Sequence, residues 1–131
     1  MDKVSRATSS AKLLLDARDV DGACNSAYYA MFDAAGAALI WSGAPVDATG
    51  AKTHSGLISA FSLRVVKTGL LPVELGRTLN RAAEIRLVAD YTGDEVTLDN
   101  ARWAVEQAMA FVDAVRRRLE SPRTDPADGA V

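Results

Sequence analysis

The segment AEIRLVADYTG, residues 83–93, contains an arginine at a position where a helix would place an apolar side chain. At 100° per residue, Arg86 lies in a narrow apolar stripe of the helix, formed by Leu75, Leu79, Ala82 and Ala89. An unpaired guanidinium in such a stripe costs several kcal/mol. Asp90, one turn further on, can pair with it. Two interpretations remain: a structural arginine shielded by Asp90, or an arginine that faces a cleft or subunit interface and binds phosphate.

The only histidine of the chain, His54, begins the segment HSGLISAF. A helical wheel places it with Leu57, Ile58 and Phe61, so it can be a structural residue of an apolar face. Alternatively, beside Lys52, it can act as an acid, a base or a phosphate contact in RNA chemistry.

A pair of tyrosines lies in the segment NSAYYAMFDAAGAAL, residues 25–39. Tyr28 shares a helix face with Cys24 and is expected in the core, where its hydroxyl must find a hydrogen bond. Tyr29 projects away from that face, toward Asn25 and Asp33. We therefore predict that Tyr29 and Asn25 contribute to a polar site.

The sequence motifs of several common binding and catalytic sites do not occur in this chain. One histidine and one cysteine cannot form a His/Cys zinc site, and the glycine patterns of Walker-type and Rossmann nucleotide sites do not occur. A Gly-x-Ser-x-Gly nucleophile turn does not occur either. We therefore expect no metal and no cofactor. The single Cys24 cannot form an internal disulfide and is expected to be a small buried apolar residue.

Helical spacing of apolar residues dominates the chain and predicts an all-α fold, an up-and-down bundle of about five helices. The expected helices cover about residues 3–17, 21–42, 54–69, 72–90 and 98–119, with N-caps at Asp19 or Asp21, Thr53 or Ser55, and Thr97 or Asp99. The chain is expected to form one domain, residues 1–120. Residues 121–131 contain two prolines and no apolar cluster, and are predicted to be a disordered tail.

Composition is that of an ordinary soluble protein, with 49% hydrophobic and 24% charged residues. Fifteen basic and 17 acidic residues give a net charge of −2, so no overall charge attracts nucleic acid. The N-terminus lacks the apolar region of a signal peptide, and the apolar runs are too short to span a bilayer. These features predict a cytoplasmic protein without a membrane partner.

Four segments resemble the HEPN domain superfamily in order and spacing. They are SAYYAMFDAAGAAL, KTHSGLISAF, VKTGLLPVELGRTLNRAAEIR and ADY, within Ser5 to Leu119. The chain is most similar to the small stand-alone branch called UPF0332. The resemblance implies four core helices plus a shorter one, a homodimer, and a minimal nucleotidyltransferase partner in toxin–antitoxin modules.

Many HEPN proteins are metal-independent ribonucleases, whose signature is an arginine followed, after four to six residues, by a histidine. Arg86 matches the arginine, but residues 91, 92 and 93 are Tyr91, Thr92 and Gly93. A phenol holds its proton too tightly at neutral pH to be a good base. The resemblance then leaves two roles open: His54 can supply the missing imidazole from another helix or subunit, and Tyr91 can be a tyrosine that the partner adenylylates.

The leading functional hypothesis is a toxin–antitoxin-like HEPN protein that acts with a minimal nucleotidyltransferase partner and has RNA as its ligand. A second hypothesis is an active metal-independent ribonuclease that uses Arg86 and Asp90 with His54 or Tyr91. A third is a non-enzymatic helical adaptor that binds a protein through its alanine-rich helix.

Overall fold

A computed structural model describes residues 2–43 and 53–121 of the chain. Its elements are α1 (Asp2–Asp16), α2 (Val20–Trp41), α3 (His54–Phe61) with its π-helical continuation η2 (Ser62–Val66), α4 (Val73–Thr92) and α5 (Leu98–Glu120). No strand occurs in these residues, and the predicted all-α bundle of five helices is confirmed. The predicted disordered tail, 121–131, lies outside the described residues apart from Ser121, and so do residues 44–52, between the second and third expected helices.

Three side chains cap helix N-termini as the sequence predicts. Asp19, Thr53 and Thr97 each accept a hydrogen bond from the backbone N–H three residues further on, at 3.0, 3.0 and 3.1 Å. Each satisfies one of the N–H groups that the first turn of a helix leaves without a partner. The caps fix the starts of α2, α3 and α5, and so the positions of residues in their first turns, including His54.

The ends of α4 differ slightly from the prediction. Pro72, expected in the first turn, is instead the extended residue that precedes it. The helix continues past Asp90 through Thr92 and ends at Gly93, whose φ of 73° lies in the left-handed region. Only glycine adopts that conformation without steric cost, so Gly93 fixes where α4 stops.

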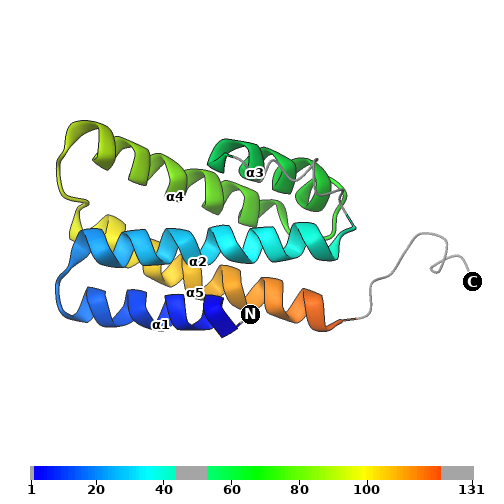
Figure 1. Ribbon diagram of the computed structural model, residues 1–131, viewed down its shortest axis with the longest axis horizontal. Coiled ribbons are helices and arrows are strands. Elements are labelled where there is room, and N and C mark those ends of the chain that lie inside the picture. The colour runs from blue at the N-terminus through cyan, green and yellow to red at the C-terminus, as the bar shows by residue number, and fades with distance from the viewer. Residues whose placement is uncertain (1, 44–52, 122–131) are drawn as a thin grey trace, which may run out of the picture.

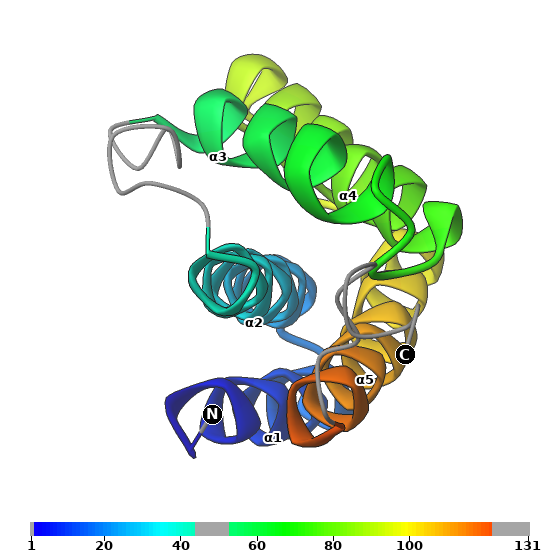
Figure 2. The same ribbon diagram turned by 90° about the vertical axis from the view of Figure 1, so that its right-hand side faces the viewer.

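Helix α2 lies at the centre of the bundle. In Figure 1 it runs between α1 and α5 on one side and α3 and α4 on the other, and Figure 2 shows the same arrangement along the helix axes. Every other helix contacts it. Six of its ten buried residues are alanines, which let neighbouring backbones approach closely. The largest side chain in this buried set is Tyr28, only 2% exposed.

Two polar contacts tie loops to the bundle. The Asp21 carboxylate, at the start of α2, accepts a hydrogen bond from the Val96 N–H at 2.8 Å and so holds the α4–α5 connection. Arg118 of α5 donates to the Leu70 carbonyl at 3.1 Å, and its guanidinium lies 4.7 Å from the centre of the Trp41 ring.

Within the described residues no helix has the length and apolar character needed to cross a bilayer.

Candidate functional site

Arg86 lies on the face of α4 that packs toward α2, and its side chain is 25% exposed. Its guanidinium carbon is 4.7 Å from the centre of the Tyr29 ring and 5.3 Å from that of Tyr28. The negative face of an aromatic ring attracts a cation at such distances. These two rings from α2 therefore provide much of the compensation that an arginine in an apolar stripe requires.

The predicted pair between Arg86 and Asp90 is present but loose. The Arg86 Nε and Asp90 Oδ2 atoms are 3.9 Å apart, and Asp90 is largely exposed. Exposed pairs of this kind contribute about 1 kcal/mol or less, because solvent screens them. Asp90 therefore does not by itself explain how the guanidinium is accommodated, and the ring contacts carry more of the compensation.

His54 is the first residue of α3, and its position brings it to the same two tyrosines. Its Nδ1 atom is 3.2 Å from the Tyr28 hydroxyl oxygen. Its ring centre lies 5.7 and 5.8 Å from those of Tyr28 and Tyr29, and 4.5 Å from that of Phe32. Because His54 is solvent-exposed, it lies at the rim of the cluster, not inside the core. The structure thus gathers Arg86 of α4 and His54 of α3 around two rings of α2.

Burial raises the pKa of the Tyr28 hydroxyl above its ordinary value; the Arg86 guanidinium opposes this rise, and Tyr29 adds slightly to it. Tyr28 is therefore a neutral phenol at neutral pH and can either donate to His54 Nδ1 or accept from it. It is also the buried core tyrosine with a hydrogen-bonded hydroxyl that the sequence predicts.

A cavity of about 470 Å³ opens beside Arg86, between the start of α2, the end of α4 and the α4–α5 connection. Asn25 lines it, together with three carboxylates, those of Asp21, Asp90 and Asp94. One guanidinium and three carboxylates thus line the cavity, so its charge is negative except at Arg86 itself. Among the described residues, no cluster of three or more histidine, cysteine or acidic side chains is arranged to hold a metal ion.

Cys24 also lines this cavity, yet it is almost fully buried. Burial raises the pKa of its thiol, and the nearby Asp21 carboxylate adds to the rise while Arg86 opposes it. A thiol in this state is a poor nucleophile, and Cys24 is the small buried residue that the sequence predicts.

Tyr91 lies apart from this cluster. It was expected just beyond the end of a helix, but α4 extends through Thr92, so Tyr91 belongs to the last helical turn. It is 92% exposed. Five residues of helix place it about 140° around the axis from Arg86, so its phenol points away from the guanidinium. Of the two residues, His54 is therefore the one that shares ring contacts with Arg86.

The HEPN domain model matches residues 1–119. The chain belongs to the HEPN domain family. It is 36% identical over 112 residues to a UPF0332 protein of Thermotoga maritima, and the aligned region covers 84% of this chain and 80% of that protein. It is 32% identical over 112 residues to a Methanocaldococcus jannaschii protein named "Putative toxin MJ0605", covering 86% and 80% of the two chains. A UPF0332 protein of Gloeobacter violaceus is 34% identical over 114 residues, 86% of each chain. No solved structure matches the chain.

In this HEPN domain, the three positions expected for the signature histidine lie at the end of α4, where Tyr91 and Thr92 form the last turn and Gly93 ends the helix. His54, on α3, contacts the Tyr28 and Tyr29 rings of the Arg86 cluster. Sequence reasoning had named Arg86, His54, Tyr29 and Asn25, but it missed Phe32, which packs against His54. The available signal was its spacing, because Phe32 follows Tyr28 by four residues and shares its side of α2.

Replacing Tyr28 by phenylalanine tests the buried phenol. At neutral pH we expect a loss of about 0.5–1.5 kcal/mol in the free energy of unfolding, from the lost hydrogen bond to His54. Because folding raises the pKa of Tyr28, its stabilising effect is complete below the pKa of an unfolded tyrosine. This stabilising effect is lost as pH rises above about 10 and through the pKa of Tyr28 in the folded protein. Urea unfolding at about pH 8 and about pH 11 should therefore show a smaller alkaline decrease for Tyr28→Phe than for wild type.

Tyr91→Phe is the matched control for this measurement, because Tyr91 is almost fully exposed. Between the two pH values, the free energy of unfolding of Tyr91→Phe should decrease as much as that of wild type. If the free energy of unfolding decreases equally in Tyr28→Phe and Tyr91→Phe, burial of the Tyr28 phenol does not contribute to the pH dependence of stability in this range.

Proposed function

We propose that this HEPN protein is a toxin-like protein of the cytoplasm that acts on RNA, with Arg86 holding the phosphodiester and His54 moving the proton. The observation that supports this most directly is that Arg86 and His54 contact the same two rings, Tyr28 and Tyr29. The toxin name of the M. jannaschii relative supports the same class of function.

The environment of Arg86 suits a phosphate contact. Its planar guanidinium offers several N–H donors to phosphate oxygens. The tyrosine rings restrict its orientation, and the loose pair with Asp90 leaves donors available for an incoming anion. Because the Arg86 side chain is three-quarters buried, a phosphate that reaches it interacts in surroundings less polar than bulk water, which strengthens the attraction.

His54 suits proton transfer in one of its two tautomers. When Nδ1–H donates to the Tyr28 oxygen, Nε2 carries a lone pair and can accept a proton. In RNA cleavage, Nε2 would take the proton of the 2′-hydroxyl as that oxygen bonds to phosphorus. The bond from phosphorus to the 5′-oxygen breaks, that oxygen is protonated by solvent, and a 2′,3′-cyclic phosphate forms. Arg86 would stabilise the charge on the phosphoryl oxygens.

Cleavage of total RNA by the purified protein in the presence of a chelator tests this mechanism. We expect cleavage by wild type and a loss of about 100-fold or more in both Arg86→Ala and His54→Ala, the usual contributions of a charge-stabilising donor and of a proton-transfer group. Arg81→Ala is the matched control, since Arg81 lies on the same helix but is exposed and paired with Glu84; it should cleave like wild type.

Two other results would change the proposal. Loss of RNA cleavage in Arg86→Ala without loss of cleavage in His54→Ala would show that His54 does not transfer the proton. No cleavage by folded wild-type protein would exclude a stand-alone ribonuclease and leave RNA binding or partner binding, including the adaptor hypothesis.

A second part of the proposal is a minimal nucleotidyltransferase partner that adenylylates Tyr91. The exposure of Tyr91 and the turn at Gly93 support it, because together they present the phenol at a free helix end. The phenolic oxygen would attack the α-phosphorus of ATP and release pyrophosphate, leaving AMP on the tyrosine.

Incubation with ATP and a nucleotidyltransferase encoded beside this chain tests that modification. Mass spectrometry should locate AMP on Tyr91 in wild type and find none in Tyr91→Phe. Tyr29, which is partly buried against Arg86, serves as the internal comparison and should stay unmodified. AMP on Tyr29, or on no tyrosine, would contradict this part of the proposal.

The proposal also includes a homodimer that forms through the exposed side of α4. Leu87 and Val88 lie there on the helix that carries Arg86, and Leu87 is 68% exposed. Neighbouring exposed apolar residues are typical of interaction surfaces.

Sedimentation velocity of wild type and Leu87→Glu tests the dimer. Wild type should sediment as a dimer and Leu87→Glu as a monomer, because the interface would bury a carboxylate without a partner. Leu13→Glu is the matched control, since Leu13 of α1 is 69% exposed, and it should remain dimeric. A wild-type monomer, or two variants that behave alike, would contradict the assignment.

A further inference from the structure

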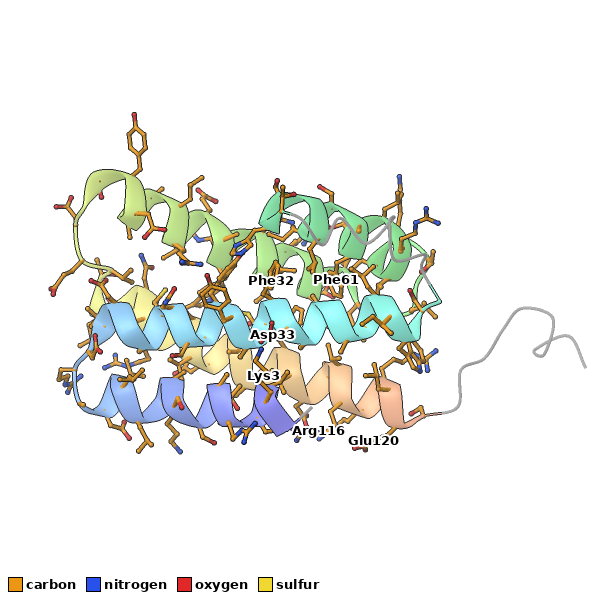
Figure 3. The ribbon with its side chains drawn as sticks, viewed as in Figure 1. Lys3, Phe32, Asp33, Phe61, Arg116 and Glu120 are labelled. Atoms are coloured by element: carbon orange, nitrogen blue, oxygen red, sulfur yellow. The ribbon has the colours of Figure 1, made fainter. Side chains whose placement is uncertain are left out.

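A second opening in the molecule is a groove of about 440 Å³ between α1 and α2. It is lined by Lys3, Ala7, Asn25, Ser26, Tyr29, Phe32 and Asp33. Figure 3 shows Lys3 extending from α1 toward Asp33 on α2, and their charged atoms are 3.9 Å apart. Aromatic rings thus line part of the groove, and amide, hydroxyl and charged groups line the rest.

This α1–α2 groove adjoins both reactive groups of the proposed site. Tyr29 lines the groove, and its ring also contacts the Arg86 guanidinium. Phe32 lines the groove and packs against the His54 ring. Asn25 lines both the groove and the cavity beside Arg86. A ligand in the groove would therefore lie next to a phosphate held by Arg86.

We propose that the α1–α2 groove binds a nucleobase of single-stranded RNA, next to the phosphate that Arg86 holds. This inference rests on the proposed function and adds a base-binding site to it. The partly exposed rings of Tyr29 and Phe32 can stack on a base, and stacking accepts any base because each has a π face. Asn25, Ser26 and Asp33 can form hydrogen bonds with the edge of the base.

Charge distinguishes the groove from the other opening. The cavity that Arg86 lines has three carboxylates for one guanidinium, so we expect it to accept the one phosphate that contacts Arg86 and to disfavour further phosphates of the strand. In the groove, Lys3 balances Asp33. A strand whose phosphate contacts Arg86 is therefore expected to continue along α1 and α2, with a base against Tyr29 and Phe32.

Binding of two strands with the same backbone tests the groove. One is a 2′-O-methyl strand of about six uridines, a length within the range of single-strand sites, and the other is its abasic counterpart. Neither can be cleaved through a 2′-hydroxyl. Fluorescence anisotropy of the labelled strands should show that wild type binds the abasic strand about tenfold or more weakly, because base stacking is lost.

Ser26→Leu fills the groove without altering Arg86, His54 or either tyrosine. It should weaken binding of the uridine strand to the level of the abasic strand. Ser59→Leu is the matched control: Ser59 lines a separate groove on α3, and this variant should bind like wild type. The comparison of the two strands on wild type stands even if Ser26→Leu does not fold.

The outcomes separate this inference from the proposed function. Equal binding of both strands by wild type, with loss of both in Arg86→Ala, would overturn the base site and leave the phosphate contact intact. Binding of neither strand by wild type would overturn the RNA function and the base site together. A preference for the uridine strand that Ser26→Leu leaves unchanged would place the base elsewhere and overturn the assignment to this groove.

Discussion

The central position of α2 constrains the rest of the molecule, because one helix must contact every other. Its buried surface is built from alanines that bring neighbouring backbones close, with few large side chains. Tyr28 is the main exception, and a buried hydroxyl needs a hydrogen-bond partner. His54, held at the first position of α3 by the Thr53 cap, provides that partner. The packing requirement of α2 thus places the only histidine at a particular point on the rim of the bundle.

The same helix accommodates the arginine of α4. A guanidinium in the apolar stripe of a helix normally needs a strong counter-charge, yet Asp90 lies 3.9 Å away and is open to solvent. The rings of Tyr28 and Tyr29 compensate for the charge without neutralising it. Arg86 therefore keeps its attraction for an anion. A structural arginine held by a close, buried carboxylate would have lost much of that attraction, and this difference is the reason why we propose Arg86 as a phosphate contact.

Most of the fold could be predicted from the sequence, because helical spacing and N-caps are local signals. The caps at Asp19, Thr53 and Thr97 and the Arg86–Asp90 pair involve residues within four positions of each other. The contacts of Arg86 with Tyr29 and of His54 with Tyr28 and Phe32 join different helices. They depend on how α3 and α4 are rotated and shifted against α2, which no local pattern specifies. The sequence therefore identified Arg86, His54 and Tyr29 as candidates, but neither Phe32 nor the arrangement of these side chains.

In the site that we propose, the imidazole and the guanidinium come from different helices, which changes what holds the two groups together. In the signature of the family, arginine and histidine share one stretch of chain, so their spacing follows from that stretch alone. In this chain, the position of His54 relative to Arg86 depends on the packing of α3 against α2 through Tyr28 and Phe32. Tyr28 lies in the dense interior and tolerates little displacement, and its hydrogen bond holds His54 at the rim. The tyrosine and phenylalanine of α2 therefore have two roles: they complete the core, and they set the distance between the two groups that the proposed chemistry requires.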